Sequence, residues 1–213
     1  MRPDLIVFSA SALVVGVMCL VFGAALNPAE AGSGVTAAVR VAGNESDRWL
    51  GMAVLYFCAS VALTCGMPAV LSLFRDRAHR LGTVGVSVLS IGAVGTSGYA
   101  MLIVFAEALA HQDVLRGGLL DSAMQDTGLA VLLWTWAAGF YLGALLVAVA
   151  LLVSRATPGW VPVLLILFVV LLPFAGPLGT SGQFIRLMAL AVAFTGIAVA
   201  AVGRSQGQRT YVA

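Results

Sequence analysis

Lysine is absent from this chain of 213 residues, and all eleven basic residues are arginine. Charge of either sign is scarce: 9% of the residues are charged, against about 25% in an ordinary soluble domain. Hydrophobic residues make up 61% of the sequence, too many for a surface that water must cover. The composition therefore predicts a protein whose solvent is the lipid bilayer. The missing lysine excludes a retinal or pyridoxal Schiff base and a lysine nucleophile.

Histidine and cysteine are also few, and their spacing excludes several kinds of site. Cys58 and Cys65 lie on one apolar run, about 10 Å apart along a helix axis, which is too far for a disulfide. His79 falls in a predicted loop and His111 at a helix end, so no pair of facing histidines is available for a membrane haem. No zinc-protease, CxxC or P-loop motif occurs. The sequence predicts no metal site, no cofactor and no nucleic-acid partner.

Long apolar runs dominate what is present. A hydrocarbon core of about 30 Å needs about 20 apolar residues per helix. Six runs meet or approach this length, at about residues 5–26, 49–74, 81–110, 128–153, 160–177 and 183–203. The first run is too long for the apolar region of a signal peptide, so we expect a retained helix. We predict an all-α polytopic membrane protein in which residues 1–213 form a single domain of six transmembrane helices.

The distribution of arginine predicts the orientation of these helices. With the N-terminus inside, the inner segments carry seven arginines and the outer segments carry four, namely Arg40, Arg48, Arg116 and Arg186. Residues 27–48 and 111–127 then form two large outer loops. The arginine, alanine, glycine and valine content indicates a bacterial genome rich in G and C. The prediction is a multi-pass protein of the bacterial inner membrane with both termini in the cytoplasm.

Glu107 is the candidate for an ionisable group at membrane depth, because it lies about one turn before the outer end of the third run. His111 follows four residues later, on the same face of a helix. The two side chains could form a protonatable pair near the outer leaflet, since intramembrane ionisable residues often mark functional sites. The alternative is that Glu107 only reaches the headgroup region and pairs with His111 or a loop arginine.

Small residues punctuate the third and fourth runs. Gly85, Gly92 and Gly95 lie on the third run, and Gly139 and Gly143 form a GxxxG motif on the fourth. Such residues let membrane helices approach closely, so we expect a packing role for them. The alternative is that the third helix lines a cavity.

Three aromatic residues, Trp134, Trp136 and Tyr141, cluster in the outer half of the fourth run. They could line a pocket for an apolar or cationic ligand. The alternative is an aromatic belt at the membrane surface.

Three sequence segments carry a resemblance to a known group of proteins. They are residues 46–51 (from Ser46-Asp47-Arg48-Trp49), residues 80–85 (from Arg80), and residues 154–165 (containing Pro158 and Trp160), together with a glutamate near the end of the third run. Over nearly the whole chain the pattern resembles uncharacterised six-helix integral membrane proteins of actinobacteria, a family defined by a domain of unknown function. The resemblance implies a six-helix inner-membrane protein and supplies no activity.

Three functions agree with these features. The first is the binding or translocation of a small amphiphilic molecule by a non-enzymatic protein. The second is an accessory subunit or scaffold of a membrane complex, which would pair with a partner membrane subunit or with further copies of the chain. The third is an enzyme that modifies a lipid or isoprenoid with Glu107 as general acid, although acid–base chemistry usually needs a second group.

Overall fold

The structure is a computed structural model that describes residues 3–27, 45–74, 78–111, 126–174 and 179–210. Regular structure in these ranges is entirely helical, which confirms the all-α class. The six α-helices and one short 3-10 helix are α1 (Pro3–Leu26), α3 (Ser46–Ser72), α4 (His79–His111), α6 (Thr127–Ser154), α7 (Trp160–Val170), η1 (Leu172–Phe174) and α8 (Gly179–Thr210). Most of the two predicted outer loops, 27–48 and 111–127, lies outside the described residues.

Five of the helices, α1, α3, α4, α6 and α8, are long and apolar enough to cross a membrane. The chain is therefore a multi-pass membrane protein. The exception is α7, whose 11 residues extend for about 16 Å and do not span a core of about 30 Å. The sequence predicts a transmembrane helix over about 160–177, the shortest of the six runs, whereas the α-helix in the structure ends at Val170 and is not among the candidate spans. Pro173 lacks a backbone N–H and disfavours helical geometry at Leu172, so the chain changes to η1 soon after Val170.

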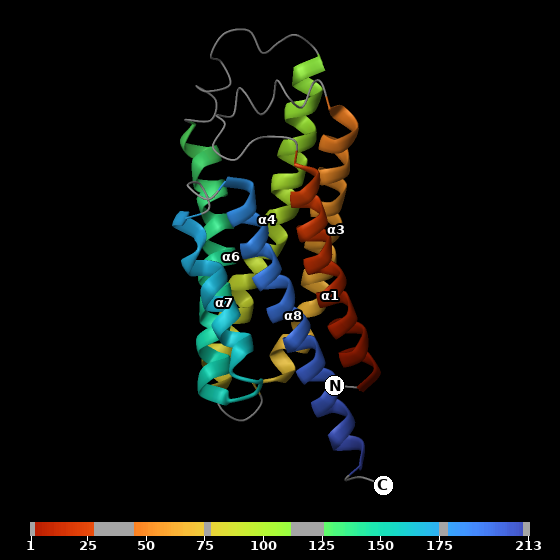
Figure 1. Cartoon of the computed structure of the whole chain (residues 1–213), viewed down its shortest axis with the longest axis vertical. Coiled ribbons are helices and arrows are strands. Elements are labelled where there is room, and N and C mark those ends of the chain that lie inside the picture. The colour runs from red at the N-terminus through yellow and green to blue at the C-terminus, as the bar shows by residue number, and fades with distance from the viewer. Residues whose placement is uncertain (1–2, 28–44, 75–77, 112–125, 175–178, 211–213) are drawn as a thin grey trace.

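The helices form a closed ring. Each one packs against the next along the chain, from α1 through α3, α4, α6 and α7 to α8, and α8 returns to pack against α1 (Figure 1). Large side chains that are fully buried fill much of its interior, among them Leu13, Leu63, Leu89, Leu151, Leu165 and Phe194.

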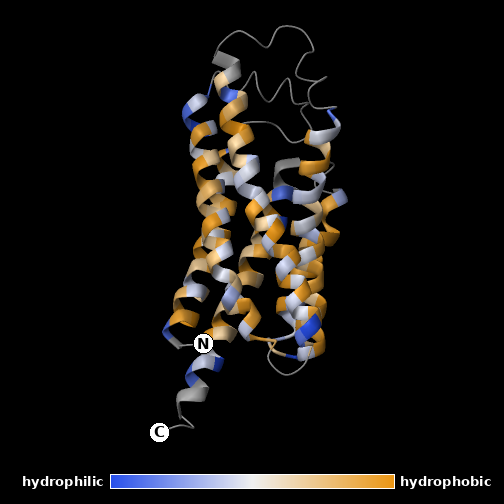
Figure 2. Ribbon diagram, turned by 180° about the vertical axis from the view of Figure 1, so that it is seen from behind, coloured by the Kyte–Doolittle hydropathy of each residue, from blue (hydrophilic) through white to orange (hydrophobic). Residues whose placement is uncertain are grey.

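Both the start of α1 and the end of α8 lie at the same end of the bundle, and the last turns of α8 extend beyond the other helices (Figure 1). Hydrophobic residues predominate along the helices, and most hydrophilic residues lie toward the two ends (Figure 2). This distribution is that of a bundle with its apolar middle in lipid. The orientation of the bundle relative to the cytoplasm and the identity of the membrane that holds it stay predictions.

Glycines allow α4 and α6 to pack backbone against backbone. A Cβ atom added to Gly92 would lie 2.3 Å from the backbone N of Phe140, and one added to Gly143 would lie 2.4 Å from the backbone N of Leu89. Gly139 and Gly85 face the opposite helix at 2.9 and 3.0 Å in the same way. The separations at Gly92, Gly139 and Gly143 are shorter than real Cβ contacts, and the one at Gly85 is tighter than most, so a larger residue would force the two helices apart.

A serine on α1 supports a weak turn of α3. Pro68 lies inside α3, where its missing N–H and its ring disturb the hydrogen bonds of the preceding turn. The hydroxyl of Ser9 donates to the carbonyl of Cys65 (2.8 Å) and accepts from the N–H of Ala69 (2.9 Å). A regular α-helix would join these two backbone groups directly. Ser9 thus bridges them from the neighbouring helix and is itself buried.

Trp49 joins the first turn of α3 to α4. Its indole N–H donates to the carbonyl of Ile103 (2.9 Å), and the ring packs against Met52, Ala53 and Ile103. The side chain of Trp49 is therefore buried between helices near the end of the bundle.

Candidate functional site

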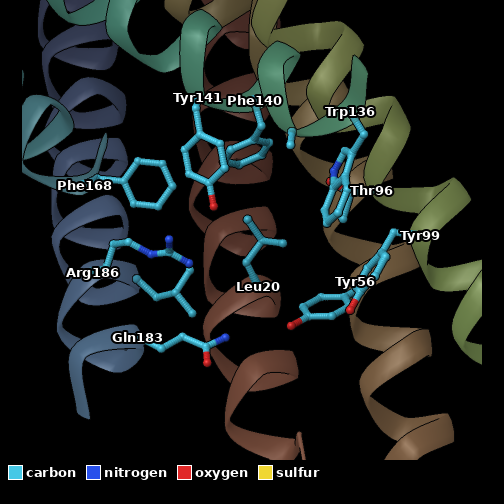
Figure 3. A pocket seen from close by; sticks show the side chains of 12 residues that line it. Leu20, Tyr56, Thr96, Tyr99, Trp136, Phe140, Tyr141, Phe168, Gln183 and Arg186 are labelled. Carbon is cyan, nitrogen blue, oxygen red and sulfur yellow. The ribbon is translucent and has the colours of Figure 1, made fainter. Parts of the chain in front are cut away.

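A cavity of about 230 Å³ lies inside the ring, and all six helices contribute to its lining. The residues that line the cavity lie toward the end of the bundle that is opposite the two chain termini (Figure 1, Figure 3). Most of the wall is aromatic, formed by Tyr56, Tyr99, Trp136, Phe140, Tyr141 and Phe168. The polar members of the lining include Thr96, Gln183 and Arg186. An apolar cavity with a few polar groups is the usual form of a small-molecule site.

One wall is a stack of three aromatic rings from three helices. The rings of Tyr99 and Trp136 are stacked at 4.6 Å between centroids, and Tyr56 lies 5.9 Å from Tyr99 in a tilted arrangement. The indole N–H of Trp136 donates to the hydroxyl of Thr96 (3.2 Å), which in turn donates to the carbonyl of Gly92 (3.1 Å). Both polar atoms are therefore satisfied within the wall, and the three rings present a mainly aromatic surface that also carries the hydroxyls of Tyr56 and Tyr99.

Local structure on α4 and α6 sets the position of Trp136. The carboxylate of Asp126 caps α6 by accepting from the N–H groups of Gly128 (2.9 Å) and Leu129 (3.1 Å), which fixes where this helix begins. A Cβ atom on Gly95 would lie 2.7 Å from Cδ1 of Trp136. Gly95 therefore makes room for the indole, while Gly85, Gly92, Gly139 and Gly143 bring the two helices together.

The opposite wall contains a buried arginine. The Cζ atom of Arg186 lies 5.7 Å from the ring centroid of Tyr141 and 5.6 Å from that of Phe168, within cation–π range of both. The two rings are stacked on each other at 5.4 Å. Figure 3 shows the guanidinium, the amide of Gln183 and the hydroxyl of Tyr141 pointing toward the space between the two walls. The cavity therefore has a cationic polar side and an aromatic side.

Arg186 corrects one expectation from the sequence. Its position near the start of the last apolar run places it with the arginines of the outer segments between helices. In the structure α8 begins at Gly179, so Arg186 lies two turns inside the helix and within the candidate span Gly182–Gln206. Only 9% of its surface is exposed. A charged residue inside an apolar run was the available signal, since such residues are rare and usually functional.

The predicted site residues are only partly brought together. Trp136 and Tyr141 line the cavity. Trp134 is 75% exposed on the outer face of α6 and does not line it. The carboxylate of Glu107 accepts a hydrogen bond from the hydroxyl of Ser46 (2.5 Å), which joins the end of α4 to the start of α3 away from the cavity lining. His111 is the last residue of α4, and its side chain lies outside the described residues.

A second hollow, of about 420 Å³, lies between α1, α7 and α8 toward the other end of the bundle. Its polar side chains are Thr195, whose hydroxyl donates to the carbonyl of Ala191 (2.8 Å) on its own helix, and the half-exposed Trp160. The described lining of this hollow contains no charged side chain. Over the ranges that the structure describes, no group of three or more histidine, cysteine, aspartate or glutamate side chains could hold a metal ion.

Replacing Arg186 by methionine should stabilise the empty protein. A charge at membrane depth costs roughly 2.5–3.5 kcal/mol on insertion scales. The cation–π contacts of the buried guanidinium with the two rings return about 2 kcal/mol of this. We therefore expect Arg186→Met to raise the free energy of unfolding by about 1 kcal/mol, measured by titrating the maltoside-solubilised protein with sodium dodecyl sulfate.

The control for this measurement is Arg48→Met. Arg48 is half exposed and pairs with Glu45 (2.5 Å), so its removal should change the free energy of unfolding by less than about 0.5 kcal/mol. A clear loss of stability in Arg186→Met would instead make this arginine part of the packing of the bundle.

No protein-family model, no curated protein and no solved structure matches this chain significantly. The resemblance to actinobacterial six-helix proteins stays a prediction. What is established is a multi-pass, all-α membrane protein whose described helices line an aromatic cavity that contains a buried arginine.

Proposed function

We propose that the chain binds a small amphiphilic molecule in the central cavity. The observation that carries this proposal is the division of the lining into an aromatic wall, with Tyr99 and Trp136, and a polar side, with Gln183 and Arg186. An amphiphile has the same division within one molecule. Its apolar part would contact the rings, and its head group would contact the polar side chains.

The size of the cavity limits the ligand. Sites for drug-sized ligands measure about 300–1,000 Å³, and this cavity is smaller, at about 230 Å³. It suits a short amphiphile, or the head and first carbons of a longer one. Such a molecule would reach the site by partitioning into the bilayer first.

Binding is better supported than translocation. On each of α1, α3 and α4, a fully buried leucine lies between the cavity and the end of the bundle that holds the chain termini. Each leucine is seven to ten residues, or about two to three turns, from the residues of the same helix that line the cavity. These residues are Leu13, Leu63 and Leu89, and their counterparts on α6 and α8 are Leu151 and Phe194. Among the described residues, the interior of the ring on the side of the chain termini is therefore filled by buried side chains, which favours binding over translocation.

The enzyme hypothesis gains no support from the lining, which contains no carboxylate, histidine or thiol among the described residues. Glu107 is engaged with Ser46 instead. An accessory role remains open, because apolar side chains on the outer faces of the helices suit lipid and protein partners equally well.

A cavity-filling variant tests the proposal. Ala137 lines the cavity, and Ala138, the next residue on α6, faces outward. We expect Ala137→Phe to weaken the binding of octan-1-ol and octanoate by more than tenfold, because the new ring occupies the ligand's space. Ala138→Phe should bind both probes as the wild type does.

Both probes would be measured by isothermal titration calorimetry on protein in phosphatidylcholine nanodiscs, with the heat of empty nanodiscs subtracted. Failure of the wild type to bind either eight-carbon probe would contradict the proposal. Equal binding by Ala137→Phe and Ala138→Phe would also contradict it, because the probe would then sit on the outer surface.

A further inference from the structure

Arg186 has an unusual environment for a charged side chain. It is more than nine-tenths buried, it lies within the candidate membrane span of α8, and its Nε atom has no hydrogen-bond partner. Among the described residues, no carboxylate lies within ion-pair distance of Arg186; the ion pair found there joins Arg48 to Glu45. The charge of this arginine is therefore not neutralised by any described residue.

Arg186 cannot lose its positive charge by deprotonation, because the guanidinium of arginine stays protonated in proteins. The rings of Tyr141 and Phe168 stabilise the cation from the side, but a ring provides no acceptor for the N–H groups in the plane of the guanidinium. Those N–H groups are five donors in a flat fork whose shape matches two oxygens of an oxyanion. Figure 3 shows the guanidinium facing the interior of the cavity.

We propose that the ligand of this cavity carries a single oxyanion, a carboxylate or a phosphate-ester head, that is bound by the guanidinium of Arg186. The inference rests on the proposed function and names the chemical class of the molecule. The amide of Gln183 and the hydroxyl of Tyr141 provide further donors on the same side of the cavity. Because the lining holds one cation and no acid among the described residues, a ligand with one negative charge leaves the occupied site neutral.

The geometry also orients the ligand. The anionic head lies against α8, and the hydrocarbon part extends toward the stacked rings of Tyr99 and Trp136 on α4 and α6. A cationic amphiphile of the same size would meet the guanidinium at short range, which is strongly unfavourable in a medium of low dielectric constant. The cavity should therefore discriminate by the charge of the head group as well as by size.

The test compares four probes with an eight-carbon chain: octanoate, octyl methyl phosphate (a diester with one charge), octan-1-ol and octylamine. Calorimetry in phosphatidylcholine nanodiscs should show that the wild type binds octanoate or octyl methyl phosphate at least tenfold more tightly than octan-1-ol, and octylamine most weakly. In Arg186→Gln the affinity for the anion should fall more than tenfold, while the affinity for octan-1-ol changes less than twofold. The exposed Arg48→Gln should match the wild type for all four probes.

Arg186→Lys separates charge from geometry and keeps the test usable if Arg186→Gln folds poorly. Lysine retains the positive charge but lacks the flat fork, so the anion should bind more weakly than to the wild type and more tightly than to Arg186→Gln. Equal affinities of the wild type for octanoate, octan-1-ol and octylamine would overturn the oxyanion and leave the amphiphile site standing. Unchanged octanoate binding in Arg186→Gln would also overturn the oxyanion proposal alone. If the wild type bound none of the probes, the proposed amphiphile site would be overturned as well.

A second set of nanodiscs distinguishes the source of the oxyanion. If the ligand is the headgroup of an anionic lipid, phosphatidylglycerol in the nanodisc should compete with octan-1-ol, which carries no charge and is not repelled by the membrane surface. If the ligand is a free amphiphile, octan-1-ol should bind equally in both nanodiscs. Inorganic phosphate should bind weakly in either case, because it makes no use of the aromatic wall.

Discussion

Replacing Gly92 by alanine is expected to lower the free energy of unfolding by about 1–3 kcal/mol. The added Cβ would lie 2.3 Å from the backbone N and 2.5 Å from the Cα of Phe140, so the strain falls on backbone that cannot rotate away. The helices α4 and α6 would have to separate, which also weakens the contacts made by Gly139 and Gly143. Alanine has the higher helix propensity, by about 0.5–1 kcal/mol, so the expected loss runs against the local preference.

Gly98→Ala is the matched control, because Gly98 lies on the same helix and an added Cβ would meet no atom within 4 Å. It should leave stability unchanged or raise it slightly. Both variants would be unfolded with sodium dodecyl sulfate in maltoside micelles and followed by tryptophan fluorescence. If Gly92→Ala proved as stable as Gly98→Ala, the close approach of α4 and α6 would be wrong.

Replacing Ser9 by alanine is the second change with a large expected effect. It removes one hydroxyl and leaves two backbone groups, the carbonyl of Cys65 and the N–H of Ala69, without the bridge that joins them. An unsatisfied buried polar group costs about 1–3 kcal/mol, and no water is available at this depth to replace the partner. Partial closure of the turn before Pro68 would recover some of this, so we expect a loss of about 1–2 kcal/mol.

Ser11→Ala provides the control on the same helix. The hydroxyl of Ser11 bonds the carbonyl of Val7 one turn earlier, a group that already belongs to the hydrogen-bonding pattern of α1. Its loss should change stability by less than about 0.5 kcal/mol. A double variant, Ser9→Ala with Pro68→Ala, should recover most of the lost stability, because α3 can then form its own hydrogen bonds. No recovery would mean that Ser9 acts independently of the proline.

The helices could be predicted from the sequence because each apolar run is long and its flanks are polar. The runs say little about which face of a helix points inward, since a helix that is apolar all round has no distinguishing stripe. Trp134 and Trp136 illustrate this. Residues two positions apart on an α-helix are related by a rotation of about 200°, so the two indoles point to nearly opposite sides. Grouping them in one pocket contradicted helical geometry, and only Trp136 lines the cavity.

The buried arginine could have been found, because Arg186 lies inside the predicted run 183–203. Its proximity to the end of that run favoured an interfacial position, and the helix in fact starts earlier, at Gly179. The segment before Gln183, with Gly179, Thr180, Ser181 and Gly182, has the composition of a loop, so this earlier start was not apparent from the sequence. The partners Tyr141 and Phe168 come from two other helices, so their meeting with Arg186 depends on tertiary packing.

The contact between α1 and α8 joins two helices between which the ribosome must synthesise α3, α4, α6 and α7. Until α8 is synthesised, the face of α1 that later packs against α8 is exposed to lipid. The cavity also lacks the cation of Arg186 until then. Arg186 makes α8 a poor resident of bare lipid, which favours its insertion directly against the helices already in place. A ribosome that stops before residue 179 would therefore release five helices in an open arc rather than a smaller version of the ring.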